Sequence, residues 1–217
     1  MADIFREVDE EVRREQLKKL WDRYQNLVFV GVFLILAAVG GWRGYEYWQI
    51  KLAAETGAAF EAAQTLSDEG KHAEAEAAFA KIIAEGPASY RALARVRQAA
   101  ELAQREPKSA IPAYEKIADD RSVSQALQDL AAVRAGSLLI DEGSFTEARS
   151  RLEPLAAQGR PYRFTARELL AVAAWRSGDM TAAKRWFDMI AADIQTPPAT
   201  RARIEMLIAL GATGSGS

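Results

Sequence analysis

The run from Leu27 to Trp42 contains no charged residue and is apolar on every side of a helix. The charge-free window extends over residues 24–42, and a helix of roughly 19 residues just crosses a hydrocarbon core of about 30 Å. The sequence therefore predicts one transmembrane helix, in a segment that we place at residues 24–48. The side chains expected to anchor it in lipid are Leu27, Phe29, Phe33, Leu34, Leu36 and Trp42.

A soluble core helix and a cleaved signal peptide both fit this run less well. A core helix of a soluble domain would not carry aromatic rings at both of its ends, where lipid headgroups would lie (Trp21 and Tyr24 before the run, Trp42, Tyr45, Tyr47 and Trp48 after it). A cleaved signal peptide would begin with a short basic region, whereas about 26 residues rich in acidic side chains precede this run. We interpret the run as an uncleaved signal anchor.

The segment before the anchor, residues 1–23, has its own pattern. Apolar residues recur there at helical spacing with charges between them, which predicts an amphipathic helix from Asp3 to Tyr24. The helix would lie on the membrane surface or pack on a partner protein, and its mixture of acidic and basic residues favours the protein contact. The apolar positions are Ile4, Phe5, Val8, Val12, Leu17, Leu20, Trp21 and Tyr24.

Residues 51–210 contain a motif that recurs four times. It consists of a turn position, a small residue five positions later, an aromatic residue or leucine after four more, and an aliphatic residue after a further three. The small residues are separated by 35, 38 and 35 residues. The four sets are Gly70, Ala75, Phe79 and Ile82; Arg105, Ala110, Tyr114 and Ile117; Gly143, Ala148, Leu152 and Leu155; and Gly178, Ala183, Phe187 and Ile190.

This spacing predicts hairpins of two antiparallel helices. A small residue lets the two helices approach closely, the large residue one turn later packs toward the next pair, and glycine permits a tight turn. No run alternates with a period of two, so we expect no sheet. The predicted fold is all-α: an N-terminal transmembrane helix, an αα-hairpin solenoid of about four repeats, and a C-terminal capping helix at Pro198–Leu210, followed by a flexible tail at residues 211–217.

Charge predicts the orientation in the membrane. Lys and Arg are more frequent just before the run than just after it, so the N-terminus is expected in the cytoplasm and residues 51–210 on the far side. The chain as a whole is nearly neutral, with 28 basic and 30 acidic residues, and lacks the basic stripe that nucleic acid would require. The absence of cysteine excludes disulfides, thiolate metal sites and cysteine nucleophiles.

The residues that usually carry chemistry do not form a catalytic pattern. His72 is the only histidine, so a metal site built from histidines and a Ser-His-Asp triad are both excluded. We expect His72 to be solvated at the start of a helix. The acidic pairs Asp119–Asp120 and Asp141–Glu142 are interpreted as surface charge at helix ends. We therefore predict no enzyme activity, no metal, no cofactor and no small-molecule substrate.

A helical solenoid offers a concave surface, formed by the first helix of each hairpin, on which a peptide or a partner helix can lie. The repeat register places eight side chains there, although each could equally be an ordinary inward-facing or solvated position. Trp175 and Trp186 are expected to pack between hairpins rather than to anchor a partner. The eight candidate partner-binding residues are Phe60, Gln64, Arg95, Val133, Ser137, Glu168, Val172 and Arg176.

The repeat resembles the tetratricopeptide repeat (TPR), a helical hairpin of about 34 residues with a turn glycine, small residues and an aromatic residue at fixed positions. The resemblance is partial, because the first-helix signature is degraded, Arg105 replaces the turn glycine, and the third unit is about four residues longer. Phe60, Arg95, Val133 and Glu168 do not match the Lys and Asn residues with which some TPR receptors bind an acidic chaperone tail.

The order of the parts resembles a narrower family, the bacterial inner-membrane ancillary subunits of the Sec translocon. This resemblance rests on a short charged segment, one span ending in Gly41-Trp42-Arg43, and an alanine-rich hairpin array. It implies a periplasmic TPR-like domain whose partners are translocon subunits, periplasmic chaperones or exported chains. An envelope adaptor for cell division or cell-wall synthesis is the alternative, and a membrane-tethered enzyme is a distant one.

Overall fold

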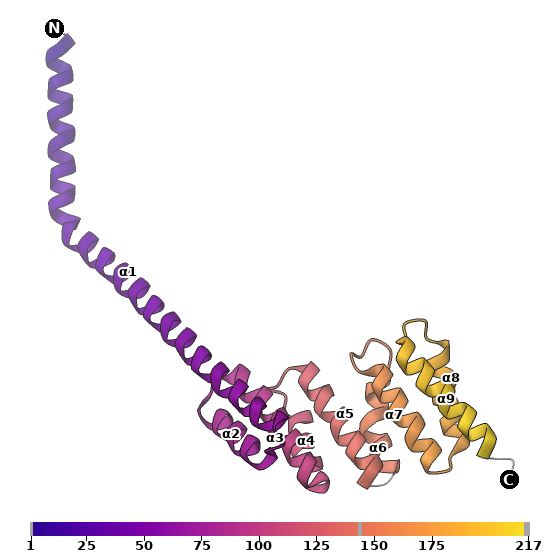
Figure 1. Cartoon of the computed structure of the whole chain (residues 1–217). Helices are drawn as coiled ribbons and strands as arrows, with labels where there is room; N and C mark the ends of the chain where they lie inside the picture. The colour runs from indigo at the N-terminus through magenta and orange to yellow at the C-terminus, as the bar shows by residue number, and fades with distance from the viewer. Residues whose placement is uncertain (1, 143–144, 215–217) are drawn as a thin grey trace. The chain divides into compact units, whose positions relative to one another are not determined.

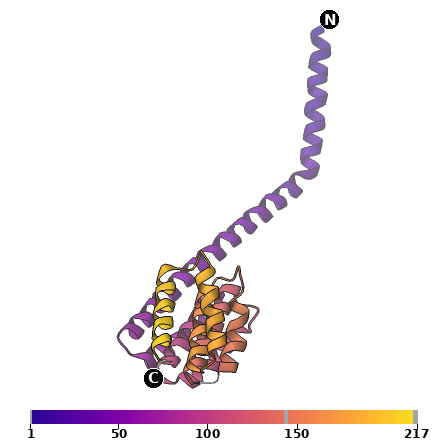
Figure 2. The ribbon, with the colours of Figure 1, turned by 90° about the vertical axis from the view of Figure 1, so that its right-hand side faces the viewer.

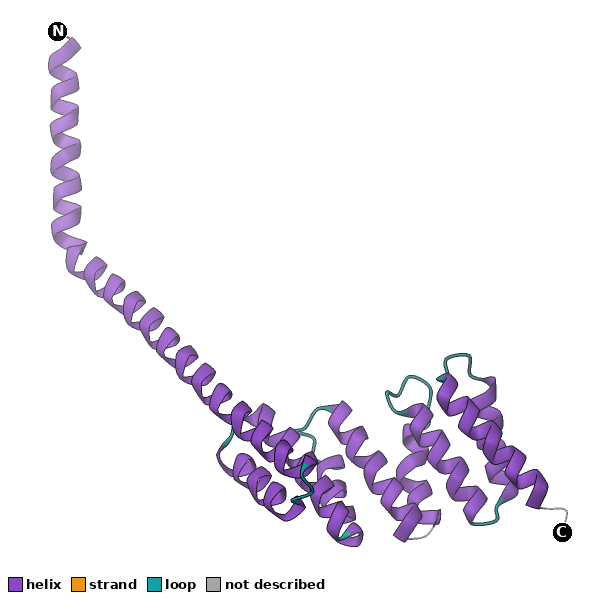
Figure 3. Ribbon diagram, viewed as in Figure 1, coloured by secondary structure: helices purple, strands orange, loops and turns teal. Residues whose placement is uncertain are grey.

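A computed structural model describes residues 2–142 and 145–214 (Figure 1). Over these residues it contains helices and loops and no strand (Figure 3), which confirms the predicted all-α class. The elements are α1 (Ala2–Asp68), α2 (His72–Glu85), α3 (Ala88–Arg105), α4 (Pro107–Ala118), α5 (Gln125–Glu142), α6 (Phe145–Leu152), the 3₁₀ helix η1 (Glu153–Leu155), α7 (Arg163–Arg176), α8 (Met180–Ala192) and α9 (Pro198–Gly214).

The chain divides into two compact units, Met1–Ala54 and Glu55–Ser217. The long helix α1 crosses the boundary between them. The predicted segments 1–23 and 24–48 and the first helix of the first hairpin are therefore stretches of one helix rather than separate helices.

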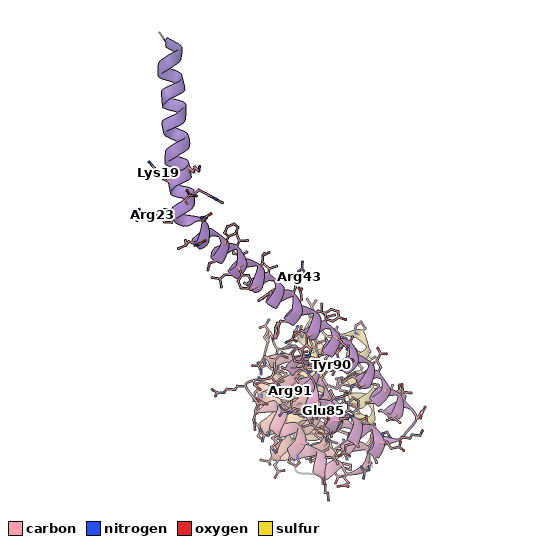
Figure 4. All side chains as sticks on the ribbon, turned by 90° about the vertical axis from the view of Figure 1, so that its left-hand side faces the viewer. Lys19, Arg23, Arg43, Glu85, Tyr90 and Arg91 are labelled. Atoms are coloured by element: carbon pink, nitrogen blue, oxygen red, sulfur yellow. The ribbon has the colours of Figure 1, made fainter. Side chains whose placement is uncertain are left out.

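Side chains in the apolar run of α1 are exposed. Leu27 is 72% exposed, Phe33 70% and Trp42 71%. Arg23 and Arg43 stand at the two ends of the run (Figure 4). Within the described residues, α1 is the one helix that is long and apolar enough to cross a membrane. The apolar window of this helix is 0% buried, unlike the interior helix of a soluble domain, which is mostly buried.

The side chains of residues 1–17 and of Leu20 lie outside those that the structure describes. The backbone of residues 2–23 is helical, as expected. The amphipathic character of this stretch remains a prediction.

The second unit is built from four helical hairpins, and Figure 2 shows its helices gathered into one bundle. They pair the end of α1 with α2, α3 with α4, α5 with α6, and α7 with α8. The four small residues of the motif (Ala75, Ala110, Ala148 and Ala183) are each 0% or 1% exposed. The large and aliphatic positions of the motif are also buried in all four hairpins. The motif positions read from the sequence therefore lie on the buried side of each hairpin's second half.

Three clusters form the core of this unit. The first lies around Phe79 in the first hairpin, the second around Tyr114 in the second hairpin and α5, and the third around Leu170 in the last two hairpins. Trp186 is buried in the third cluster and Trp175 packs against it, which confirms that both rings lie between helices.

The turns within the hairpins are of two kinds. Gly70 and Gly178 have φ values of +76° and +81°, in the left-handed region that favours glycine. The second hairpin has no such glycine. A single residue, Glu106, separates its helices, and Pro107 occupies the first position of α4, where its missing N–H leaves no hydrogen bond unmade. Gly143, the turn glycine predicted for the third hairpin, lies outside the described residues.

Gly136 marks the closest approach between α5 and α6. A β-carbon at this position would lie 2.5 Å from Cγ of Leu152, well inside van der Waals contact. The glycine therefore allows Leu152, the large residue of the third repeat, to pack directly on the backbone of α5.

Helix α9 occupies the place expected for the capping helix, and it continues four residues beyond the predicted end, to Gly214. Residues 215–217 of the predicted tail lie outside the described part of the chain. Ile204 is buried against α7 and α8, whereas Met206 and Ile208 are exposed. The outer surface of the last helix is therefore not uniformly polar, although a terminal cap usually is.

Candidate functional site

Ion pairs connect the first helices of the last hairpins. Arg176 on α7 donates to Asp141 on α5, with 2.6 Å between nitrogen and oxygen. Arg203 on α9 donates through two nitrogens to Glu168 on α7, at 2.8 Å for the Nη2 contact. We call the surface that carries these four residues the first-helix face. Because these pairs are partly solvated, each contributes little to the stability of the fold.

Two predicted partner-binding residues lie beside these pairs. Val172 is half-buried, one helical turn from both Glu168 and Arg176, and Ser137 is half-buried, one turn before Asp141. Val172 and Ser137 therefore add apolar and polar surface next to the charged residues of the two ion pairs. Glu168 and Arg176 are on the predicted face, but each already has an intramolecular partner.

Val133 is placed differently from the prediction. It is 5% exposed and packs in the third core cluster with Leu152 and Leu170. The repeat register placed this position on the exposed concave surface, but the neighbouring helices cover it. A direct contact between Val133 and a partner is excluded by this burial.

Arg95 also lies elsewhere than predicted. Its guanidinium donates to Asp120 at 2.6 Å, and its side chain lines a hollow of about 210 Å³ together with residues of α2 and α4. Arg95 therefore faces the second helices rather than the first-helix face. The reason is the short turn at Glu106. The first and fourth hairpins have three residues between their helices, whereas the second has one. Counting the same number of residues back from Ala110 therefore reaches a position in α3 that is two residues too early.

Phe60 belongs to the core rather than to an open surface. Its ring contacts Phe79 edge to face, with centroids 5.3 Å apart, and lies 6.0 Å from the ring of Tyr90. The phenol oxygen of Tyr90 reaches Gly57, where it would lie 2.9 Å from a β-carbon. Gln64, the other predicted partner-binding residue of this hairpin, lies one turn after Phe60 and is half-buried. Its polar side chain therefore remains partly at the surface.

His72 is not simply solvated, in contrast to the expectation from sequence. Its Nδ1 lies 2.7 Å from a carboxylate oxygen of Glu101, and the hydroxyl of Ser67 donates to the other oxygen at 2.6 Å. Glu101 is buried, so these contacts compensate the cost of removing its carboxylate from water. The cluster joins the first turn to α3 and is structural.

A second buried network was not anticipated from the sequence. Arg167 on α7 donates through Nε to the carbonyl of Ala156 and through Nη1 to Asp193, at 2.9 Å each. The hydrogen bond from Arg167, followed by one from the backbone of Gln195, lowers the pKa of the Asp193 carboxyl. The network fixes the loop between α8 and α9, and with it the position of the last helix.

Asp120 gives a testable pH dependence. Hydrogen bonds from the Ser122 hydroxyl and from Arg95 lower the pKa of this carboxyl from 3.8 to about 2. A lowered pKa in the folded state means that the ionised carboxylate stabilises the fold above pH 3.8, and that this contribution is lost as the pH falls toward 2. We expect Asp120→Asn to lower the urea midpoint at pH 7, with the difference from wild type shrinking between about pH 4 and about pH 2.

Asp119→Asn is the matched control, since the Asp119 side chain is 71% exposed and its paired nitrogen on Arg151 is 3.7 Å away. The urea midpoint of the Asp119→Asn protein should equal that of the wild type at every pH. Identical pH profiles for the two variants would contradict the assigned role of Asp120.

A groove of about 380 Å³ lies at the C-terminal end of the repeat unit, between α7, α8 and α9. Its walls are mostly apolar, and its rim carries one acidic and one basic residue of α8. The lining residues are Trp175, Met180, Ala183, Lys184, Phe187, Asp188, Leu207 and Ile208. Sequence reasoning missed this groove, because Ala183 and Phe187 were recognised only as packing positions.

The described residues contain no group of three His, Cys, Asp or Glu side chains arranged to hold a metal ion. The polar networks found in those residues connect one helix to another. What the arrangement offers chemically is binding surface: a first-helix face with fixed charges, and an apolar groove at its C-terminal end.

Comparison with known proteins identifies a family that the chain matches. The profile of a family described as a tetratricopeptide repeat-like domain matches residues 18–207. The match begins before the apolar run and ends in α9, so it includes the apolar part of α1 as well as all four hairpins. No curated protein and no solved structure matches the chain.

Proposed function

Because the chain belongs to the tetratricopeptide repeat-like domain family, we propose that it is a membrane-anchored scaffold whose repeat unit binds other proteins. The observation that carries this proposal is the exposed, uncharged stretch of α1, which is long enough to cross a bilayer and precedes the helical repeats of the second unit in the sequence. Helical repeat arrays bind peptides and helices on extended surfaces, and the first-helix face is such a surface.

We further propose that the protein is an ancillary subunit of the bacterial Sec translocon, linking protein export to periplasmic chaperones. The support is the order of its parts: a short charged segment, one span and an alanine-rich hairpin array. The proposed topology places residues 1–23 in the cytoplasm and the repeat unit in the periplasm. It is supported by the basic residues before the apolar run, which outnumber those after it. The residues before it are Arg13, Arg14, Lys18, Lys19 and Arg23, and those after it are Arg43 and Lys51.

Single cysteines test the topology cleanly, because the chain has no cysteine of its own. Lys18→Cys and Ala58→Cys are exposed positions on either side of the run. In spheroplasts, a membrane-impermeant maleimide should label the Ala58→Cys protein at once and the Lys18→Cys protein only after permeabilisation. The reverse pattern would place the repeat unit in the cytoplasm and exclude a periplasmic function.

Co-purification tests the partner. The full chain, tagged at its C-terminus and extracted in mild detergent, should enrich translocon subunits over a tagged control protein with an unrelated single span. Enrichment of cell-wall or division proteins instead would assign the protein to the alternative, an envelope adaptor. A preparation that enriches neither class would contradict both proposals.

A further inference from the structure

Charged contacts between successive second helices follow a rule in this chain. In the second and third hairpins, the residue five positions after the small alanine is acidic, and it pairs with an arginine of the next second helix. Glu115 on α4 binds Arg151 on α6 at 2.7 Å, and Glu153, the first residue of η1 directly after α6, binds Arg185 on α8 at 3.4 Å.

The first hairpin provides an internal comparison. Five positions after its small alanine, the first hairpin has Ala80 instead of an acidic residue. The second hairpin has Pro112 and Ala113 at the two positions where the third and fourth hairpins carry the paired arginine. The acid and the arginine of the next hairpin are thus present together or absent together. The pair is a recurring element of the contact between second helices.

In the fourth hairpin the acidic position is filled, by Asp188. Its partner here is Lys184 of the same helix, at 2.8 Å, with both side chains largely exposed. Within the described part of the chain, no arginine pairs with Asp188. The last hairpin therefore presents the acid of the recurring pair to solvent.

The apolar groove lies at the same place. Phe187 and Ala183 of α8 form one wall, and Leu207 and Ile208 of α9 form another. In the second and third hairpins, the recurring pair brings the second helix of the following hairpin beside this position. Here Ile208 and Met180 are exposed instead.

We propose that this groove binds an amphipathic helix of a partner protein, which lies along α8 in the place of a fifth second helix. The partner helix carries an arginine or lysine that pairs with Asp188, and it packs apolar side chains against Phe187 and Ile208. The proposal depends on the scaffold function above only in that the repeat unit binds proteins.

A second copy of this chain is a poorer occupant. Its own second helices α2, α4, α6 and α8 are each packed within a hairpin, so none is free to enter the groove without unfolding a repeat. A helix of another protein that carries a basic residue can both pair with Asp188 and fit the apolar groove.

The chain itself supplies a suitable probe. A peptide with the sequence of residues 179–193 reproduces α8, whose Arg185 makes the recurring pair in the array. A lactam between Lys184 and Asp188, an i,i+4 pair, holds so short a peptide helical. Binding of the fluorescein-labelled peptide to the full chain in lipid nanodiscs is measured by anisotropy.

The expected result is saturable binding that Asp188→Arg in the protein weakens at least fivefold and that Arg185→Glu in the peptide then restores. Ile208→Glu should also weaken binding at least fivefold. Glu74→Arg, an equal charge change at an exposed position of α2, is the matched control and should leave binding unchanged.

Absence of saturable binding, or equal binding by the Asp188→Arg and Glu74→Arg proteins, would overturn the proposal. Self-association of the full chain that Asp188→Arg abolishes would overturn it in favour of a second copy. Because the peptide assay contains no translocon component, its failure is distinguishable from failure of the co-purification, and each proposal can stand without the other.

Discussion

Replacing Leu34 and Leu36 with arginine is expected to move the protein from the membrane pellet to the soluble fraction. Both residues lie near the middle of the apolar run and are exposed, so no neighbouring helix shields an introduced charge. An arginine at the centre of a spanning helix costs about 2.5–3.5 kcal/mol on insertion scales, so two cost about 5–7 kcal/mol. The two charges therefore strongly oppose insertion of a span that has no length to spare. The measurement is carbonate extraction followed by immunoblotting.

The control places the same two charges in α1 beyond the run, as Ala58→Arg with Ala62→Arg, where the side chains are also exposed. This protein should remain in the pellet. Retention of the Leu34→Arg, Leu36→Arg protein after carbonate treatment would mean that residues 24–48 are not what holds the chain in the membrane.

Phe79→Ala is expected to cause the largest loss of stability among single substitutions in the repeat unit. Phe79 is 0% exposed, and its ring contacts Phe60 edge to face. Removing a buried ring leaves a cavity and costs about 3–5 kcal/mol. For a unit of this size that loss lowers the melting temperature by roughly 10 °C. Because each repeat contacts only its neighbours, hydrogen exchange should accelerate mainly in the first two hairpins.

Leu93→Ala is the matched control, since this leucine of α3 is exposed. Its melting temperature should stay within about 2 °C of the wild type, as is usual for a surface substitution. A Phe79→Ala protein that melts as the wild type does would show that the motif position is not a core position, and the repeat register would then be wrong.

The fold could be predicted because its determinants are local. The alanine at each small position and the large residue one turn later are four residues apart, and helical geometry alone places them on one face. Gly70 and Gly178 could be assigned to turns for the same reason, and both have positive φ. The all-α class and the hairpin register needed no information from distant parts of the chain.

The candidate site was less predictable because its contacts are long-range. Arg167 and Asp193 are 26 residues apart, and nothing near either residue indicates their pairing. The error at Arg95 has a local cause, the one-residue turn at Glu106, which changes the register of α3 by two positions. A proline directly after the predicted turn was the available signal, since proline in the first helical position favours an immediate helix start.

The burial of Val133 could not be predicted from the sequence. The repeat register placed Val133 on the concave surface, but whether a side chain is exposed there depends on how closely the next helix packs. Gly136 brings α5 against Leu152, and this close approach closes the surface around Val133. Sequence spacing alone does not give that distance.

Photo-crosslinking in living cells tests the central claim, that the first-helix face of a membrane-anchored repeat unit binds proteins, most directly. Probes are placed in the full chain at Ser137 and Val172 on this face, and at Lys81, an exposed position of α2, as the control. The account predicts that Ser137 and Val172 capture translocon subunits or exported chains and that Lys81 does not. Equal capture from all three positions, or no capture from Ser137 and Val172, would contradict it.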